Sequence, residues 1–178
     1  NYKREVPEVA KKVLVTMGGS DPDNVTLKVI RALVQIDIPD LEAVVVVGPS
    51  NPHRETLRWA AESSPLPISL VENVENMPEL MAWADIAISA GGTTVWEFLF
   101  LGVPTLTVPI ANNQREITRI LNEWGFVEGL NWCQDAIGMD VGRLISERLQ
   151  RIILDDDIRT LLALRGRQLV DGCGVLRV

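Results

Sequence analysis

The sequence predicts a Rossmann-like α/β domain in which a parallel sheet lies between two layers of helices, giving three layers, α/β/α. Short β-branched apolar runs alternate with segments of helical periodicity along the chain, a pattern typical of a parallel sheet with right-handed crossovers. The run Ala43–Val47 is uniformly apolar, as expected for a strand covered on both faces. Two apolar runs also end in a Gly-Gly turn that opens a helix.

Length and composition indicate one ordinary globular domain. A chain of 178 residues can build one well-cored domain, and 47% hydrophobic with 23% charged residues is typical of that class. The net charge of -7 without a basic stripe argues against a nucleic-acid partner held through phosphate contacts. No apolar run approaches the roughly 20 residues of a membrane span and no signal-peptide pattern is present, so we expect a cytoplasmic location. Cys133 and Cys173 lack metal-ligand spacing and are expected to be reduced thiols.

Strand and helix signals alternate through the first half of the chain. Residues 1–12 are polar, contain Pro7 and predict a linker from a preceding domain, so the domain itself is expected over residues 13–178. The expected elements are a strand at Val13–Met17, a helix ending near Ile36, a strand at Ala43–Val47, a helix at about His53–Glu62, a strand at Ile68–Val71 and a short helix from Asn76 to Ala84.

The stretch from Ile86 to Gln114 repeats the pattern of strand, glycine turn and helix. The expected elements are a strand at Ile86–Ser89, a turn at Gly91-Gly92, a helix at about Val95–Leu101 ended by Gly102, a strand at Val103–Pro109 and a polar loop at Ala111–Gln114. Beyond this stretch we expect a helix at Arg115–Trp124, a short strand within Gly125–Glu128, and amphipathic helices at Val141–Leu154 and Asp157–Val170.

Both glycine turns lie where parallel strands end, which is the edge of an open α/β sheet that binds ligands. Glycine lets a ligand approach the backbone closely, and the free N–H groups at a helix start receive phosphate. Neither turn carries the Gly-Lys-Ser/Thr of a nucleotide-hydrolysing loop or the GxGxxG spacing of a dinucleotide site. The pattern favours a diphosphate-bearing ligand, and the alternative is that the glycines only shape tight turns.

Several segments resemble the C-terminal, donor-binding domain of glycosyltransferase family 28: Asn73–Met77 with Ala84-Asp85, then SAGGTTVWE and LGVPTLTVPIANNQ. VLVTMGGSDPDN is similar, more narrowly, to the branch with the pseudaminic acid pathway UDP-sugar hydrolase and the spore coat polysaccharide biosynthesis protein SpsG. The resemblance implies one half of a GT-B fold, a UDP-linked sugar as ligand, no cofactor or metal, and a missing N-terminal domain as partner.

The resemblance also implies ligand contacts at defined positions. It assigns the diphosphate to Gly91, Gly92, Thr93 and Thr94 and, from the neighbouring turn, to Gly18, Gly19 and Ser20. It assigns the ribose hydroxyls to Glu97, the uracil to the backbone of Val74, and the sugar to Asn113 and Gln114.

Each of these assignments has a structural alternative. Glu97 lies three residues after Thr94 and fits a capping box, Val74 fits a core position, and Asn112–Gln114 fits a turn that caps the next helix. Other residues are expected to be structural rather than ligand-binding: Asp21 and Asp23 as helix caps, Asp155–Asp157 as a helix boundary, and Trp83 and Trp96 as core residues.

No catalytic residue is expected in this chain. The sequence contains a single histidine, His53, which we expect to be an exposed residue at a helix start, and the resemblance places a general-base histidine in the missing domain. The expected function is the UDP-sugar-binding part of a hydrolase or glycosyltransferase in surface polysaccharide or nonulosonic acid biosynthesis. The alternative is a non-catalytic Rossmann-like nucleotide-binding or interaction module.

Overall fold

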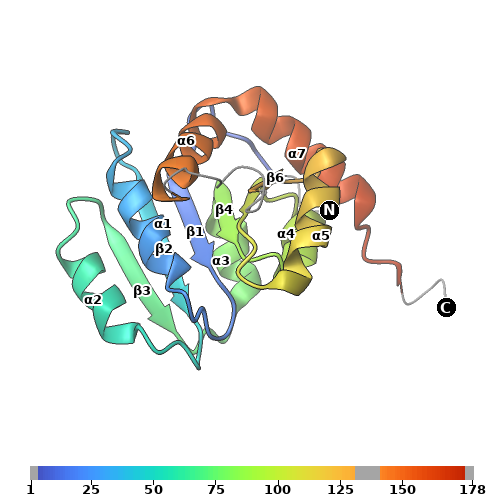
Figure 1. Ribbon diagram of the computed structural model, residues 1–178. Helices are drawn as coiled ribbons and strands as arrows, with labels where there is room; N and C mark the ends of the chain where they lie inside the picture. Colours follow the sequence, from blue (N-terminus) through green and yellow to red (C-terminus); the bar gives the residue numbers. More distant parts are fainter. Residues whose placement is uncertain (1–3, 131–140, 175–178) are drawn as a thin grey trace.

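A six-stranded parallel sheet forms the centre of the computed structural model, which describes residues 4–130 and 141–174 (Figure 1). Its strands are β1 (Lys12–Thr16), β2 (Glu42–Val47), β3 (Ile68–Glu72), β4 (Ile86–Ser89), β5 (Thr105–Thr107) and β6 (Glu128–Gly129). The helices are α1 (Val25–Val34), α2 (Arg54–Glu62), α3 (Met77–Trp83), α4 (Thr94–Leu101), α5 (Asn112–Glu123), α6 (Val141–Leu154) and α7 (Asp156–Leu169).

The strand order β3-β2-β1-β4-β5-β6 reverses between β1 and β4. From β1 the chain builds outward to β2 and β3, and it then returns through α3 to pair β4 on the other side of β1. The parallel register pairs Val13 with Ile86 and Thr16 with Ser89, so β1 and β4 end side by side. Such a switch point is where open α/β sheets bind their ligands. The predicted Rossmann-like fold is confirmed.

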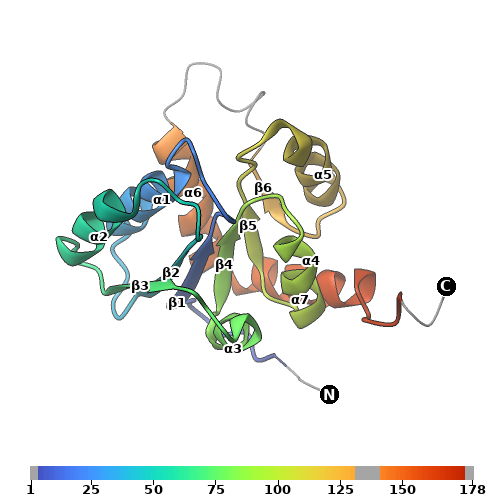
Figure 2. The same ribbon diagram turned by 90° about the horizontal axis from the view of Figure 1, so that it is seen from below.

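Alternate residues of β1 enter two separate hydrophobic cores, which explains its uninterrupted apolar sequence. Val13 and Val15 pack in the core that α1 and α6 cover, whereas Leu14 packs with Met81 of α3 and Phe98 of α4 on the other face. Figure 2 shows these helix pairs on opposite sides of the sheet. Both faces of β1 are therefore buried, one under each of the two helical layers that the sequence predicts.

The segment before β1 is held firmly although it forms neither helix nor strand. Arg4 donates to the carbonyl oxygen of Met81 at 2.8 Å, and the N–H of Ala10 donates to that of Ile153 at 3.0 Å. Ala10 is fully buried. Residues 4–11 are therefore packed against α3 and the end of α6, and Lys12, predicted as the last linker residue, is the first residue of β1.

Arg159 of α7 anchors the same segment from a fully buried position. Its guanidinium donates to the carbonyl oxygens of Ile152 at 2.7 Å, Ile153 at 2.6 Å, Glu8 at 2.9 Å and also Pro7. Burial lowers the pKa of this guanidinium from its ordinary value, and the hydrogen-bonded carbonyl oxygens compensate for the lost hydration. One side chain therefore ties the end of α6 to the segment before β1.

The largest differences from the expected element boundaries are at β5, β6 and α5. β5 covers only Thr105–Thr107 because Pro104 and Pro109, which lack an N–H, flank it. β6 lies at Glu128–Gly129, at the end of the expected segment and beyond it. α5 begins at Asn112 rather than Arg115, so the expected polar loop is largely the first turn of a helix.

The two tryptophans expected in the core differ in environment. Trp83 is half-buried and packs against the core under α3 and α4. The prediction that Trp96 is a core residue is wrong, because 39% of its surface is exposed on α4. Cys173 is a free, exposed thiol, and Cys133 lies outside the described residues. Within residues 4–130 and 141–174, every helix is too short or too polar to cross a bilayer.

Candidate functional site

The turn between β4 and α4 presents a series of free backbone donors. The N–H groups of Gly91, Gly92, Thr93 and Thr94 donate to no acceptor in residues 4–130 and 141–174, and the first N–H bonded back is that of Val95, to Gly92 at 3.3 Å. They lie at the positive end of the α4 dipole, where an anion is stabilised by both the dipole and the N–H groups. The turn thus has the free donors that a phosphate-like group would need.

The turn between β1 and α1 lies next to it, because Thr16 and Ser89 are paired at the ends of β1 and β4. Gly18 has a φ of +78°, a conformation that other residues rarely adopt. Gly19 has no atom within 4 Å of the position that a Cβ would take, so its backbone is open to an approaching ligand. The two glycine turns predicted from separate parts of the chain are therefore neighbours at the switch point.

Gly48, which follows β2, supports the first turn from behind. A Cβ on Gly48 would lie 2.2 Å from the carbonyl oxygen of Gly18 and 2.4 Å from that of Gly19. The N–H of Ser50 donates to the same Gly19 oxygen at 2.9 Å. This role of Gly48 is not predicted from the sequence, in which its one local signal is a glycine directly after a buried strand.

His53 links the same two loops. It is half-buried at the N-cap of α2, and its Nε2 lies 2.9 Å from the carbonyl oxygen of Pro22. A carbonyl oxygen can only accept, so Nε2 carries the proton and donates. His53 lies at a helix start, as expected, but it is half-buried rather than exposed, because this contact holds the ring against the β1–α1 loop.

Asp21 performs the predicted capping role. It is fully buried and accepts from the N–H of Val25 at 2.8 Å, the N–H of Thr26 at 2.8 Å and the Thr26 hydroxyl at 2.6 Å. These bonds hold the start of α1, and with it the end of the first glycine turn. Asp155 likewise accepts from Ile158 at the start of α7, as expected of a helix boundary.

Gln114 lies against the second glycine turn. Its Oε1 accepts from the N–H of Ile110 at 2.9 Å, so its Nε2 is the end directed toward Gly92, 3.9 Å from the position that a Cβ on Gly92 would take. Asn113 is exposed on the same first turn of α5. The structure thus places Gln114 against the second glycine turn, with its Nε2 donor directed toward Gly92.

Glu97 and Val74 lie in positions that their assigned roles allow. Thr93 is the N-cap of α4 and makes no side-chain cap bond, so the alternative capping box between Thr94 and Glu97 is not formed. Glu97 is exposed, and within the described residues its carboxylate has no hydrogen-bond or ion-pair partner. Val74 is half-buried just after β3, at the same edge of the sheet.

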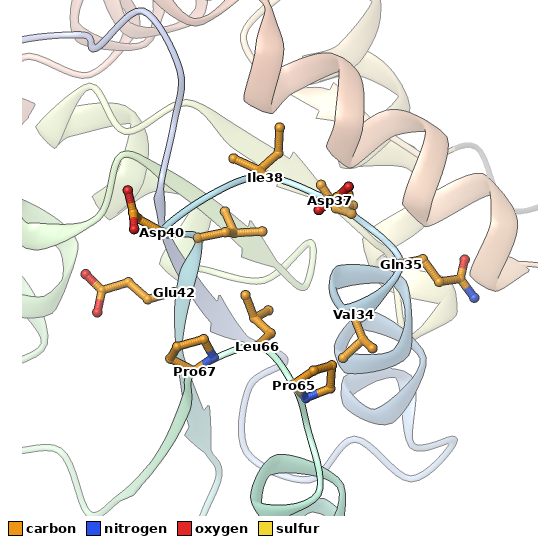
Figure 3. Close-up of a pocket in the computed structure, with 11 residues that line it drawn as sticks. Val34, Gln35, Asp37, Ile38, Asp40, Glu42, Pro65, Leu66 and Pro67 are labelled. Carbon is orange, nitrogen blue, oxygen red and sulfur yellow. The ribbon is translucent and has the colours of Figure 1, made fainter.

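Two hollows lie at opposite edges of the sheet. One of about 250 Å³ lies beside the site and is lined by Asp23, Asn112 and Arg115 among others. The other, of about 790 Å³, lies near the amino ends of β2 and β3 (Figure 3), where Asp40 and Leu66 are among its lining residues. The larger hollow is therefore remote from both glycine turns. In the described part of the chain no three His, Cys, Asp or Glu side chains gather as a metal site would require.

Known proteins are similar to this chain in sequence and in fold. Over 174 residues it is 32% identical to the spore coat polysaccharide biosynthesis protein SpsG of Bacillus subtilis (strain 168), covering 94% of this chain and 48% of that protein. Over 113 residues it is 33% identical to the Helicobacter pylori pseudaminic acid cytidylyltransferase and UDP-2,4-diacetamido-2,4,6-trideoxy-beta-L-altropyranose hydrolase, covering 64% and 20%. The chain thus spans half or less of the length of these relatives.

The crystal structure of Acinetobacter baumannii MurG superimposes with a TM-score of 0.68 at 18% identity, covering 94% of this chain and 50% of that one. At this identity the similarity concerns the fold, which is the Rossmann-like half of a GT-B glycosyltransferase. Residues 13–126, more than half of the chain, match the family profile described as the glycosyltransferase family 28 C-terminal domain. The chain therefore belongs to the family of glycosyltransferase family 28 C-terminal domains.

Proposed function

We propose that this domain binds the UDP portion of a UDP-linked sugar and forms the donor-binding half of a hydrolase or glycosyltransferase. The observation that carries the proposal is the pair of adjacent glycine turns at the β1–β4 switch point. The turn at Gly91–Thr94 offers N–H groups that have no acceptor within the described residues, and the backbone of Gly19 is open beside it. Two turns of this kind suit the two phosphates of a nucleoside diphosphate.

The same geometry suits a leaving group. Departure of UDP from the anomeric carbon develops negative charge on the β-phosphate, and N–H groups fixed at a helix start stabilise that charge without reorganisation. The α4 N-terminus supplies these donors, and Gln114 adds an amide donor held in place by Ile110. The domain would thereby stabilise the departing nucleotide.

Nucleoside recognition is assigned to residues at the same edge of the sheet. The unpaired carboxylate of Glu97 is available to accept from two ribose hydroxyls, and the backbone of Val74 is available to the uracil. Asn113 and Gln114 are assigned to the sugar, and Gly18 and Ser20 to the diphosphate together with Gly19. These assignments favour UDP over nucleotides with a larger base.

The names of the relatives support a role in the biosynthesis of surface polysaccharide or nonulosonic acid sugars, with water or a carbohydrate as acceptor. We place the attacking group in a second domain. His53 is the single histidine in the sequence, and its Nε2 is bonded to the carbonyl oxygen of Pro22. The relatives are about twice as long as this chain or longer, which leaves room for such a domain.

Calorimetric titration of the 178-residue chain tests the proposal. We expect UDP to bind more tightly than ADP by about 10-fold, because the uracil contacts add to those of the shared ribose and diphosphate. Inorganic pyrophosphate should bind more weakly than either nucleotide. Failure to bind UDP, or equal binding of UDP and ADP, would reject the assignment of a UDP site and favour a non-catalytic module.

Glu97→Gln tests the ribose assignment. We expect the affinity for UDP to fall by about 10-fold or more, because a carboxylate that accepts from hydroxyls makes stronger hydrogen bonds than an amide. Pyrophosphate affinity should stay the same, because that ligand has no ribose. Glu62→Gln, at the far end of α2, is the matched control and should change neither affinity. Equal losses for UDP and pyrophosphate would contradict the ribose role.

A further inference from the structure

Three buried hydroxyl side chains, Ser89, Thr107 and Thr118, lie beneath the β4–α4 turn and are called here the hydroxyl cluster. Ser89 is paired with Thr107 between β4 and β5, and Thr107 is paired with Gly129 between β5 and β6. Paired residues of neighbouring parallel strands point to the same face of the sheet. The side chains of Ser89 and Thr107 therefore share one face at the carboxyl edge.

Thr118 of α5 covers this row and reaches the glycine turn above it. A Cβ on Gly91 would lie 2.5 Å from the Thr118 hydroxyl oxygen, and a Cβ on Gly129 would lie 3.1 Å from its methyl carbon. Thr118 is thus wedged between the turn and the last strand. Gln114, one helical turn earlier, lies against Gly92, so one face of α5 follows the turn along its length.

The hydrogen-bonding capacity of this cluster is not used within the described residues. The hydroxyls of Thr107 and Thr118 have no partner there, although the two residues are 0% and 1% exposed. Ser89 donates only to the neighbouring carbonyl oxygen of Ala90, at 3.1 Å. Folded proteins rarely keep buried hydroxyls without a hydrogen-bond partner, because each one loses its hydration. Two such hydroxyls beside the proposed ligand-binding turn therefore indicate a role in that turn.

We propose that Thr118 is a positioning residue for the phosphate-binding turn, an inference that rests on the proposed function. Its hydroxyl lies against Gly91 and can rotate to donate or to accept. When the N–H groups of the turn bind phosphate, the peptide groups around Gly91 become polarised. The hydroxyl then bonds to them in a buried, low-dielectric environment, where such a bond is strong. A methyl group at the same place fills the space and cannot respond.

Thr118→Val removes the hydroxyl and keeps the shape of the side chain. We expect the affinities for UDP and pyrophosphate to fall by the same factor of about 10, the value of one buried hydrogen bond near a charged group. Binding of uridine, followed by NMR titration, should be unchanged because uridine carries no phosphate. In the ligand-free protein, the amide signals of Gly91 and Gly92 should shift.

The melting temperatures of Thr118 variants distinguish the positioning role from a purely structural role of this side chain. Thr118→Val should melt at the same temperature as the wild type or higher, because it removes an unpaired buried hydroxyl. Thr118→Ser should keep UDP affinity within about twofold of the wild type because it keeps the hydroxyl. Thr105→Val is the matched control: Thr105 is fully buried at the other end of β5 from Thr107, donates to the carbonyl oxygen of Val103 at 2.8 Å and lies away from the turn. It should lower the melting temperature without changing UDP affinity.

The positioning role of Thr118 and the UDP site can fail separately in these measurements. If the wild type binds UDP and Thr118→Val binds UDP and pyrophosphate equally well, the positioning role is overturned and the UDP site stands. Loss of uridine binding in parallel, or unchanged Gly91 and Gly92 amide signals, also overturns it. If the wild type fails to bind UDP, both are overturned.

Discussion

Gly48→Ala is expected to lower the free energy of unfolding by about 2–3 kcal/mol, as overpacking of a tight site does, and to weaken UDP binding by about 100-fold. The added Cβ would lie 2.2 Å from the carbonyl oxygen of Gly18 and 2.4 Å from that of Gly19. These are backbone atoms, so the overlap is relieved only by moving the first glycine turn away from the second. Urea denaturation and calorimetric titration measure the two effects.

Gly19→Ala is the matched control for stability. A Cβ at Gly19 meets no atom within 4 Å, so the folded state accommodates it and the free energy of unfolding should not fall. UDP binding should still weaken, because the methyl group projects from the proposed binding turn. If Gly48→Ala is as stable as Gly19→Ala and binds UDP like the wild type, then the β2–α2 loop does not set the position of the turn.

Arg159→Met is expected to lower the free energy of unfolding by about 3–5 kcal/mol, because four carbonyl oxygens lose the hydrogen bonds of one fully buried guanidinium at once. Those of Ile152, Ile153 and Glu8 are bonded to the guanidinium at 2.6–2.9 Å. The affinity of the remaining folded protein for UDP should be unchanged, because these contacts lie near the amino end of β1, opposite the glycine turns. Urea denaturation with a parallel titration tests both statements.

Arg165→Met, at a half-buried position of α7, provides the comparison. Arg165 makes one long hydrogen bond, 3.3 Å to the carbonyl oxygen of Trp124, and its replacement should change the free energy of unfolding by about 0.5 kcal/mol or less. A loss for Arg159→Met no larger than that for Arg165→Met would show that Arg159 does not hold the segment before β1.

The fold was predictable where neighbouring residues alone determine the structure. The uniformly apolar strands, the Gly-Gly turns and the short helix expected from Asn76 follow from local preferences, and the structure confirms each of them. The Asn76 side chain caps that helix by accepting from the N–H of Glu79. The start of α5 was not predictable, because Asn112–Gln114 fits a polar loop as well as a first helical turn. The bond between Gln114 and the N–H of Ile110 helps to decide for the helix, and it appears only once the chain is folded.

The candidate site shows the same division. The glycine turns were found from the sequence because each is a short pattern after an apolar run. Gly48, His53 and Thr118 were not found, because their roles depend on residues about 30 positions away that only the folded sheet brings close. No local pattern marks a threonine in α5 as the neighbour of a glycine after β4. Contacts between loops that follow adjacent strands are therefore the part of the site that the sequence alone does not predict.

The buried anchoring of residues 4–11 has a consequence for the order of folding. The segment is synthesised before the rest of this domain, yet its partners Ile153 and Arg159 follow some 150 positions later, as the Arg159–Pro7 separation of 152 shows. At typical synthesis rates that interval is roughly 8–30 s. During this time the segment before β1, a central strand of the sheet, lacks its native contacts with α6 and α7. The domain therefore completes its folding only after α7 is synthesised, so chains that stop before α6 remain open to proteolysis within residues 4–11.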